Sequence, residues 1–89
     1  MTDHARMNEL AKQALKHIKR GDFRVGPDWE AAHEICQAHE GVQVHDRIHA
    51  LCHRIEGDHG NAAYWDRRGN QPTPTGGLED EWQALNEDL

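Results

Sequence analysis

The fold is decided by residues 44–68, which read VHDRIHALCHRIEGDHGNAAYWDRR. In the first half of this stretch, apolar side chains recur at helical spacing, at Val44, Ile48, Leu51, Cys52 and Ile55. This spacing places them on one face of an amphipathic helix, which we predict over about residues 42–56. Gly57 then breaks the helix, and Asp58 is placed to cap a second helix over about residues 59–68. The stretch therefore predicts a helical hairpin.

Outside this hairpin, the spacing of apolar residues predicts three more helices. They are expected at about residues 3–20, from Pro27 or Asp28 to Gly41, and from Leu78 onward. Residues 69–77 read GNQPTPTGG and contain no apolar side chain, so we predict a flexible linker there. No segment alternates with a period of two residues, which excludes a sheet. The sequence predicts a single all-α domain over residues 1–89, with about five helices in two antiparallel hairpins and a C-terminal capping helix.

Length and charge exclude several classes of protein. The chain has 89 residues and a formal net charge of −6, and a chain this short holds one hydrophobic core at most. Nucleic-acid binding is not expected, because it requires a clustered positive field and the chain carries 10 basic against 16 acidic residues. No apolar run is long enough for a membrane span or a signal peptide, so neither is predicted.

The two cysteines, Cys36 and Cys52, indicate packing rather than chemistry. No C-x-x-C motif is present, which excludes a zinc ribbon and a thioredoxin-type redox site. Both residues fall at apolar helical positions and are predicted to be small core residues. With no export signal, free thiols fit a reducing, cytoplasmic location. Neither cysteine lies in a glycine-rich turn or at a helix start, where a thiolate would be stabilised, so we predict no catalytic residue.

The predicted hairpin resembles a tetratricopeptide repeat. The positions in register with that family's pattern are Ala50, Gly57, Asp58, Ala62 and Pro74. The chain departs from the pattern at His53, where an aromatic residue is usual, and at Gly69, where alanine is usual. The resemblance implies a divergent first hairpin in the N-terminal half and a last helix that caps the open end of the stack.

A second resemblance extends through the same hairpin. Residues 53–68 follow the pattern HRxEGDxxNAxYWxRR, which is similar to a group of small bacterial proteins of unassigned function. This resemblance implies a helical domain and a bacterial origin. It implies no activity.

Histidine is unusually frequent, with eight residues in the chain, and three of them lie at i, i+4 and i+8 on one predicted helix, at His45, His49 and His53. Two histidines four residues apart can share a metal ion, but the glutamate that zinc proteases place beside the first histidine is absent. Because each residue turns a helix by about 100°, one ion could reach two of the three. A third ligand would come from elsewhere, with His33, His39, Glu30 and Glu34 as candidates. The pattern favours solvated or hydrogen-bonded surface histidines, so we predict no metal and no cofactor.

The aromatic residues divide into core and surface. The three tryptophans, Trp29, Trp65 and Trp82, fall on apolar stripes and are predicted to supply buried area. Tyr64 lies off the stripe of its helix. We expect it to line a binding groove, whose candidate residues are His33, His49, His53, Tyr64 and Arg67.

These observations lead to one functional hypothesis and one alternative. The first is a small interaction module without catalysis, which binds a protein or peptide through the concave side of its stacked hairpins. The alternative is a metal- or small-ligand-binding protein that uses the histidine-rich face of the helix at 42–56. An enzyme is disfavoured, because no nucleophile–base pair can be assembled from the spacing of residues. The oligomeric state is left open.

Overall fold

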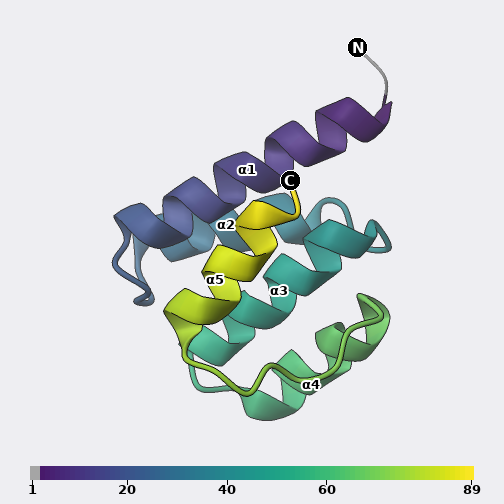
Figure 1. The fold of residues 1–89 in the computed structure, drawn as a ribbon. Coiled ribbons are helices and arrows are strands. Elements are labelled where there is room, and N and C mark those ends of the chain that lie inside the picture. The colour runs from purple at the N-terminus through teal and green to yellow at the C-terminus, as the bar shows by residue number, and fades with distance from the viewer. Residues whose placement is uncertain (1–2) are drawn as a thin grey trace.

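Five helices are present in the computed structural model, which describes residues 3–89 (Figure 1). They are α1 (Asp3–Arg20), α2 (Pro27–Gln37), α3 (Gln43–Ile55), α4 (His59–Arg68) and α5 (Leu78–Glu87). No strand occurs among the described residues, so the all-α prediction is confirmed. Residues 69–77, the predicted linker, contain no helix. Within the described range, every helix is too short or too polar to cross a lipid bilayer.

The end of α2 differs from the prediction, which placed it at Gly41. The helix ends at Gln37, and the four residues that follow form turns. Gly41 has a φ of +95°, a backbone conformation that glycine adopts without a steric penalty. Its N–H donates to the Asp46 carboxylate at 3.1 Å. The glycine therefore shapes the connection between α2 and α3 rather than the end of the helix.

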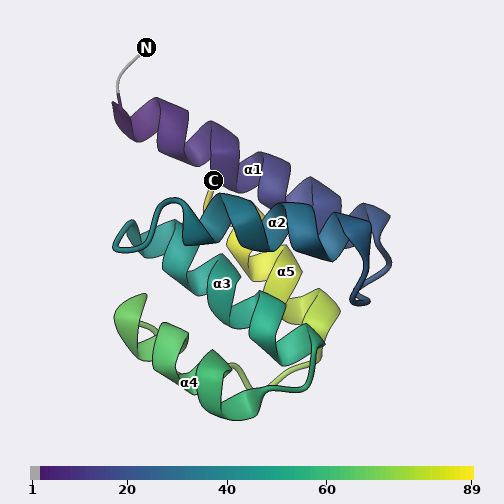
Figure 2. The ribbon, with the colours of Figure 1, turned by 180° about the vertical axis from the view of Figure 1, so that it is seen from behind.

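The central element of the fold is α3. Helices α1, α2, α4 and α5 all pack against it, as the two opposite views in Figures 1 and 2 show. Eight of its 13 residues are buried, and half of those eight are polar or charged. Its apolar members join the core with side chains from α1, α2 and α5, including Leu15, Ile18, Ala32, Cys36 and Leu85. Because α3 is covered on several sides, its histidines lie inside the protein.

The turn between α3 and α4 follows the prediction closely. Gly57 has a φ of +81°, the left-handed conformation expected of a glycine at a helix C-terminus. The Asp58 carboxylate accepts a hydrogen bond from the backbone N–H of Asn61 at 3.2 Å and so caps α4. Ala62 is fully buried, whereas Ala63 is only half-buried. The two helices of the predicted hairpin, the turn that joins them, the Asp58 cap and the burial of Ala62 are confirmed.

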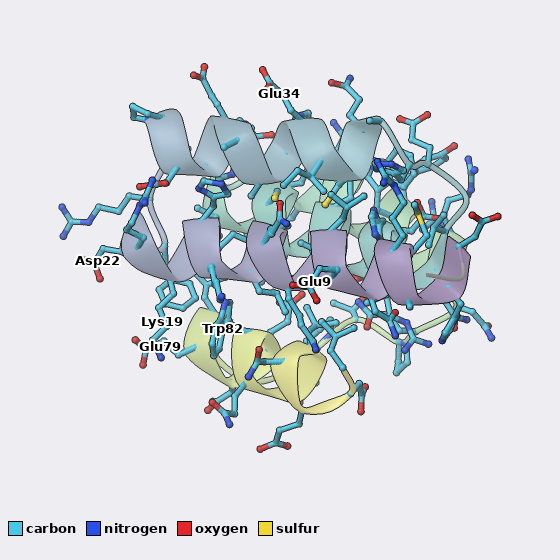
Figure 3. All side chains as sticks on the ribbon, turned by 90° about the horizontal axis from the view of Figure 1, so that it is seen from above. Glu9, Lys19, Asp22, Glu34, Glu79 and Trp82 are labelled. Atoms are coloured by element: carbon cyan, nitrogen blue, oxygen red, sulfur yellow. The ribbon has the colours of Figure 1, made fainter. Side chains whose placement is uncertain are left out.

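The last helix, α5, lies across α1 and α3, while α4 packs against the other side of α3. The indole N–H of Trp82 donates to the carbonyl of Leu15 in α1 at 2.7 Å, and Lys19 lies 4.5 Å from the centre of the same ring. Figure 3 shows Trp82 extending from α5 toward α1, with Lys19 beside it. The C-terminal helix therefore covers the face formed by α1 and α3 and does not stack on α4.

A buried ion-pair network fastens three helices together. Arg54 of α3 donates to Asp66 of α4 at 2.8 and 2.9 Å and to Glu81 of α5 at 2.7 and 2.8 Å. Both carboxylates are almost completely buried. Gln71 supports the network by donating its side-chain N–H to Asp66 at 2.8 Å. One guanidinium thus fixes the positions of both C-terminal helices relative to α3.

Candidate metal centre

Three imidazole rings meet where α2 packs against α3. His49 and His53 lie one turn apart on α3, and His33 faces them from α2. One ring nitrogen of each lies within 4.8 Å of the others. The Nε2 atoms of His33 and His49 are 3.0 Å apart. Two ligands of a tetrahedral ion bound at 2.0–2.1 Å lie about 3.3 Å apart, a separation close to that of the His33 and His49 nitrogens.

The environment favours the neutral form of two of these imidazoles, His33 and His49. His49 is 2% exposed and His53 is 8% exposed, whereas His33 is half-buried. Burial is the main cause that lowers the pKa of His49 to about 3, and the neighbouring imidazoles of His33 and His53 contribute to the same shift. Burial is also the main cause of the lowered pKa of His33. A histidine must be neutral to bind a metal, so these two rings are ready to act as ligands at neutral pH.

Two tryptophans hold the rings in place. Trp29 stacks on His33, with 4.9 Å between ring centroids and 8° between ring planes. Trp65 stacks on His49 at 4.0 Å and 15°. Trp29 is itself fixed, because its indole N–H donates to the carbonyl of Cys52 at 2.8 Å. The rotamers of His33 and His49 are therefore constrained by packing, which is a requirement for a preorganised ligand set.

His53 has the hydrogen bond that typically supports a metal-binding histidine. Its Nδ1 donates to the Glu56 carboxylate at 2.7 Å. This bond fixes the ring and leaves Nε2 as the nitrogen with a free lone pair. Carboxylates in this position orient the ring and raise its basicity toward a metal. Glu56 was not among the residues singled out from the sequence, although residues three positions apart are neighbours on a helix and its position after His53 could have indicated this contact.

His49 carries an unpaired atom. Its Nδ1 is buried and has no hydrogen-bond partner. In the metal-free protein, the tautomer with the proton on Nε2 is favoured, because His33 can accept that proton and only a lone pair at Nδ1 then goes unused. Metal binding through Nε2 would place the proton on Nδ1, where no protein group accepts it. Such an unpaired donor costs about 1–3 kcal/mol.

The fourth histidine of interest, His45, is separate from this cluster. It is fully buried, and its Nε2 donates to the carbonyl of Met7 at 2.8 Å. Its ring meets the ring of His39 edge-on at 4.9 Å. The geometric prediction that one ion could reach only two of the three α3 histidines agrees with this arrangement, and His33 provides the third nitrogen. Solvated or hydrogen-bonded surface histidines were expected from the sequence. The three α3 histidines are hydrogen-bonded, but their expected surface position was wrong, because α3 is buried between its neighbours.

The remaining groove candidates lie farther out. Tyr64 is 41% exposed and touches Trp65 edge-on at 5.0 Å between ring centroids. It is therefore linked to the histidine cluster only through the Trp65 ring. Arg67 is exposed on α4. The arginine that contacts this aromatic pair is Arg68, which donates to the Tyr64 hydroxyl at 2.8 Å and lies 5.3 Å from the centre of Trp65.

The cysteines are core residues, as predicted. Cys36 and Cys52 are both fully buried free thiols. A hydrogen bond to Cys52 and burial together raise the pKa of Cys36 well above its usual value. A thiol in this state stays protonated and is a poor nucleophile.

Comparison with known protein families, with curated proteins and with solved structures gives no match to this chain. The function must therefore be inferred from the site itself. Three neutral imidazoles suit zinc, copper and nickel, whereas magnesium and calcium prefer oxygen ligands. The site defined by His33, His49 and His53, called the histidine triad below, thus has the donor set of a centre for a late transition metal.

Proposed function

We propose that the protein binds one late transition-metal ion, with zinc as the reference case, through the histidine triad. The observation that supports this proposal best is the meeting of three buried or half-buried imidazoles from two helices, with one nitrogen each inside 4.8 Å. Apolar side chains at these positions would fill the core without leaving a buried nitrogen unpaired, as Nδ1 of His49 is. The cost of burying polar rings therefore favours a role for them other than packing. Metal binding, which was only the alternative function in the sequence analysis, is therefore placed ahead of protein or peptide binding.

The expected affinity follows from opposing contributions. Packing against two tryptophans and the hydrogen bond that His53 donates to Glu56 reduce the ordering cost of the ligands. The unpaired N–H that metal binding creates on His49 costs about 1–3 kcal/mol, which corresponds to a loss of roughly 5- to 150-fold in affinity. We therefore expect a weaker site than a structural zinc centre in which every second nitrogen is bonded.

Metal binding would link α2 to α3, because His33 lies on α2 and the other two ligands, His49 and His53, lie on α3. A ligand at a hundred times its dissociation constant stabilises the folded state by about 2.7 kcal/mol. For a domain of this size, that corresponds to a rise in melting temperature of about 10 °C or more.

Thermal unfolding with and without zinc at pH 7.5 tests this proposal. We expect zinc to raise the melting temperature of the unmodified protein and of a His39→Gln variant. His39 is the matched control, because it is half-buried, follows α2 directly and lies outside the triad. His33→Gln should lose the shift while still folding, since His33 is the triad member nearest solvent. An equal shift in all three proteins, or none in the unmodified protein, would contradict the proposal.

A second function, protein or peptide binding, is favoured by the surface of α4. Tyr64 is one of two exposed large hydrophobic side chains in the described chain, and Arg68 donates a hydrogen bond to its hydroxyl. Rigid tyrosine and arginine side chains are typical of interaction hot spots. A photo-crosslinking amino acid at position 64 should capture one defined partner in cells. The same group at position 12, an exposed site on α1, is the control, and identical capture patterns at both sites would refute a docking role for α4.

A further inference from the structure

The histidine triad supplies three protein ligands and no fourth. Among residues 3–89, no carboxylate, thiol or further imidazole joins the three rings within the same distance. The nearest carboxylate partner, Glu56, is bound to Nδ1 of His53, the nitrogen opposite the free lone pair. Structural zinc sites are closed by four protein ligands, whereas sites with three protein ligands keep one position for water or substrate. The ligand count is therefore that of an open centre.

The charge of the site indicates what would fill the open position. Three neutral imidazoles contribute no negative charge to a divalent ion, and the Glu56 carboxylate bonded to the triad offsets only part of the ion's charge. The rings of Trp29 and Trp65 lie against two of the ligands, so the surroundings screen this charge poorly. An unpaired charge in such a place is costly, and an anionic ligand removes the cost. The same effect lowers the pKa of a zinc-bound water to about 7, so that hydroxide is available from solvent.

The open position is accessible from the α2 side of the site. His33 is only half-buried, in contrast to His49 and His53. Solvent therefore reaches the cluster beside α2, where the rings of Trp29 and Trp65 are stacked on two of the ligands. A small ligand with one negative charge and an oxygen donor meets both conditions.

Resting on the metal binding proposed above, we infer that the metal in the histidine triad takes one small monoanionic oxygen ligand as its fourth partner. Two sources share this chemistry. One is hydroxide, formed when a bound water loses a proton to solvent, and the other is the carboxylate of a small organic acid. Binding of either leaves the three imidazoles in place and reduces the net charge of the centre from +2 to +1.

Cobalt substitution tests this inference, because the visible absorption of Co²⁺ reports the number and type of its ligands. The unmodified protein is titrated with Co²⁺ at pH 7.5 in a buffer that does not coordinate metals. One equivalent should produce a saturating spectrum, which His39→Gln should retain and His53→Gln should lose. Circular dichroism of both variants establishes that each is folded.

The cobalt-loaded protein is then examined in two arms. Addition of acetate should shift the spectrum with saturation, and azide should compete with it as a second small anion. Raising the pH from 6 to 9 without added anion should shift the spectrum in one step, as a bound water becomes hydroxide. A response in either arm identifies the source of the ligand. A cobalt spectrum that changes neither with acetate nor with pH would overturn this inference and leave metal binding intact. The absence of any cobalt spectrum would refute the proposed function itself.

Discussion

The metal-free protein should lose stability as the pH falls from 7.5 to 5, mainly through His49. The pKa of His49 is about 3 in the folded state, against an ordinary value of 6.5 in the unfolded chain. Between these two values the unfolded state binds a proton that the folded state does not, so lowering the pH favours unfolding. From pH 7.5 to 5, this difference amounts to about 2 kcal/mol for His49 alone. The lowered pKa values of His33 and His45 add to the loss in the same direction.

The assay is urea denaturation of the metal-free chain at pH 7.5, 6.5, 5.5 and 5, with chelator present. This window lies above the ordinary pKa of aspartate and glutamate, so imidazoles dominate the change. A His49→Gln variant should lose about 2 kcal/mol of the pH dependence, whatever its stability at pH 7.5. His4→Gln, at an exposed position, is the control and should leave the pH dependence unchanged. If His49→Gln shows the same dependence as the unmodified protein, the buried, neutral state of His49 is refuted.

Three further predictions concern the fold and can be read from chemical denaturation. Gly57→Val should lower the free energy of unfolding by about 1 kcal/mol or more, because Gly57 has a φ of +81°, and no measurable loss would contradict the turn geometry. Ala62→Leu should cost about 1–3 kcal/mol by overpacking a fully buried position, and the half-buried Ala63→Leu should cost less. Arg54→Met should cost about 3–5 kcal/mol, because it leaves two buried carboxylates without their partner, and a loss below 1 kcal/mol would show that the network is dispensable.

Local features of this chain were predictable because short-range rules determine them. The start of every helix lies within one residue of its predicted position, and the Gly57 turn, the Asp58 cap and the small contact residue Ala62 all follow the pattern read from the sequence. The helix starts, the turn and the cap depend on residues no more than four positions apart. The exception is α2, which ends before Gly41 because that glycine is used in the connection to α3.

Features that depend on several helices at once were not predictable. Helical rotation indicated that two of the α3 histidines could share an ion, but only the packing of α2 on α3 shows that His33 is the third member. The burial of these polar rings was missed, because helical spacing does not reveal that four helices cover α3. The same holds for Arg54, whose two carboxylate partners lie 12 and 27 residues away in sequence.

X-ray absorption at the zinc edge tests whether His33, His49 and His53 together bind the metal ion. The sample is the protein loaded with one equivalent of zinc at pH 7.5. We expect three imidazole nitrogens at about 2.0 Å, with the outer-shell scattering that imidazole rings produce, and one further light ligand. The same measurement on His33→Gln should show the imidazole number fall to two or the zinc lost. Sulfur scattering at about 2.3 Å, or a shell of oxygen ligands with at most one imidazole, would contradict a centre built from His33, His49 and His53.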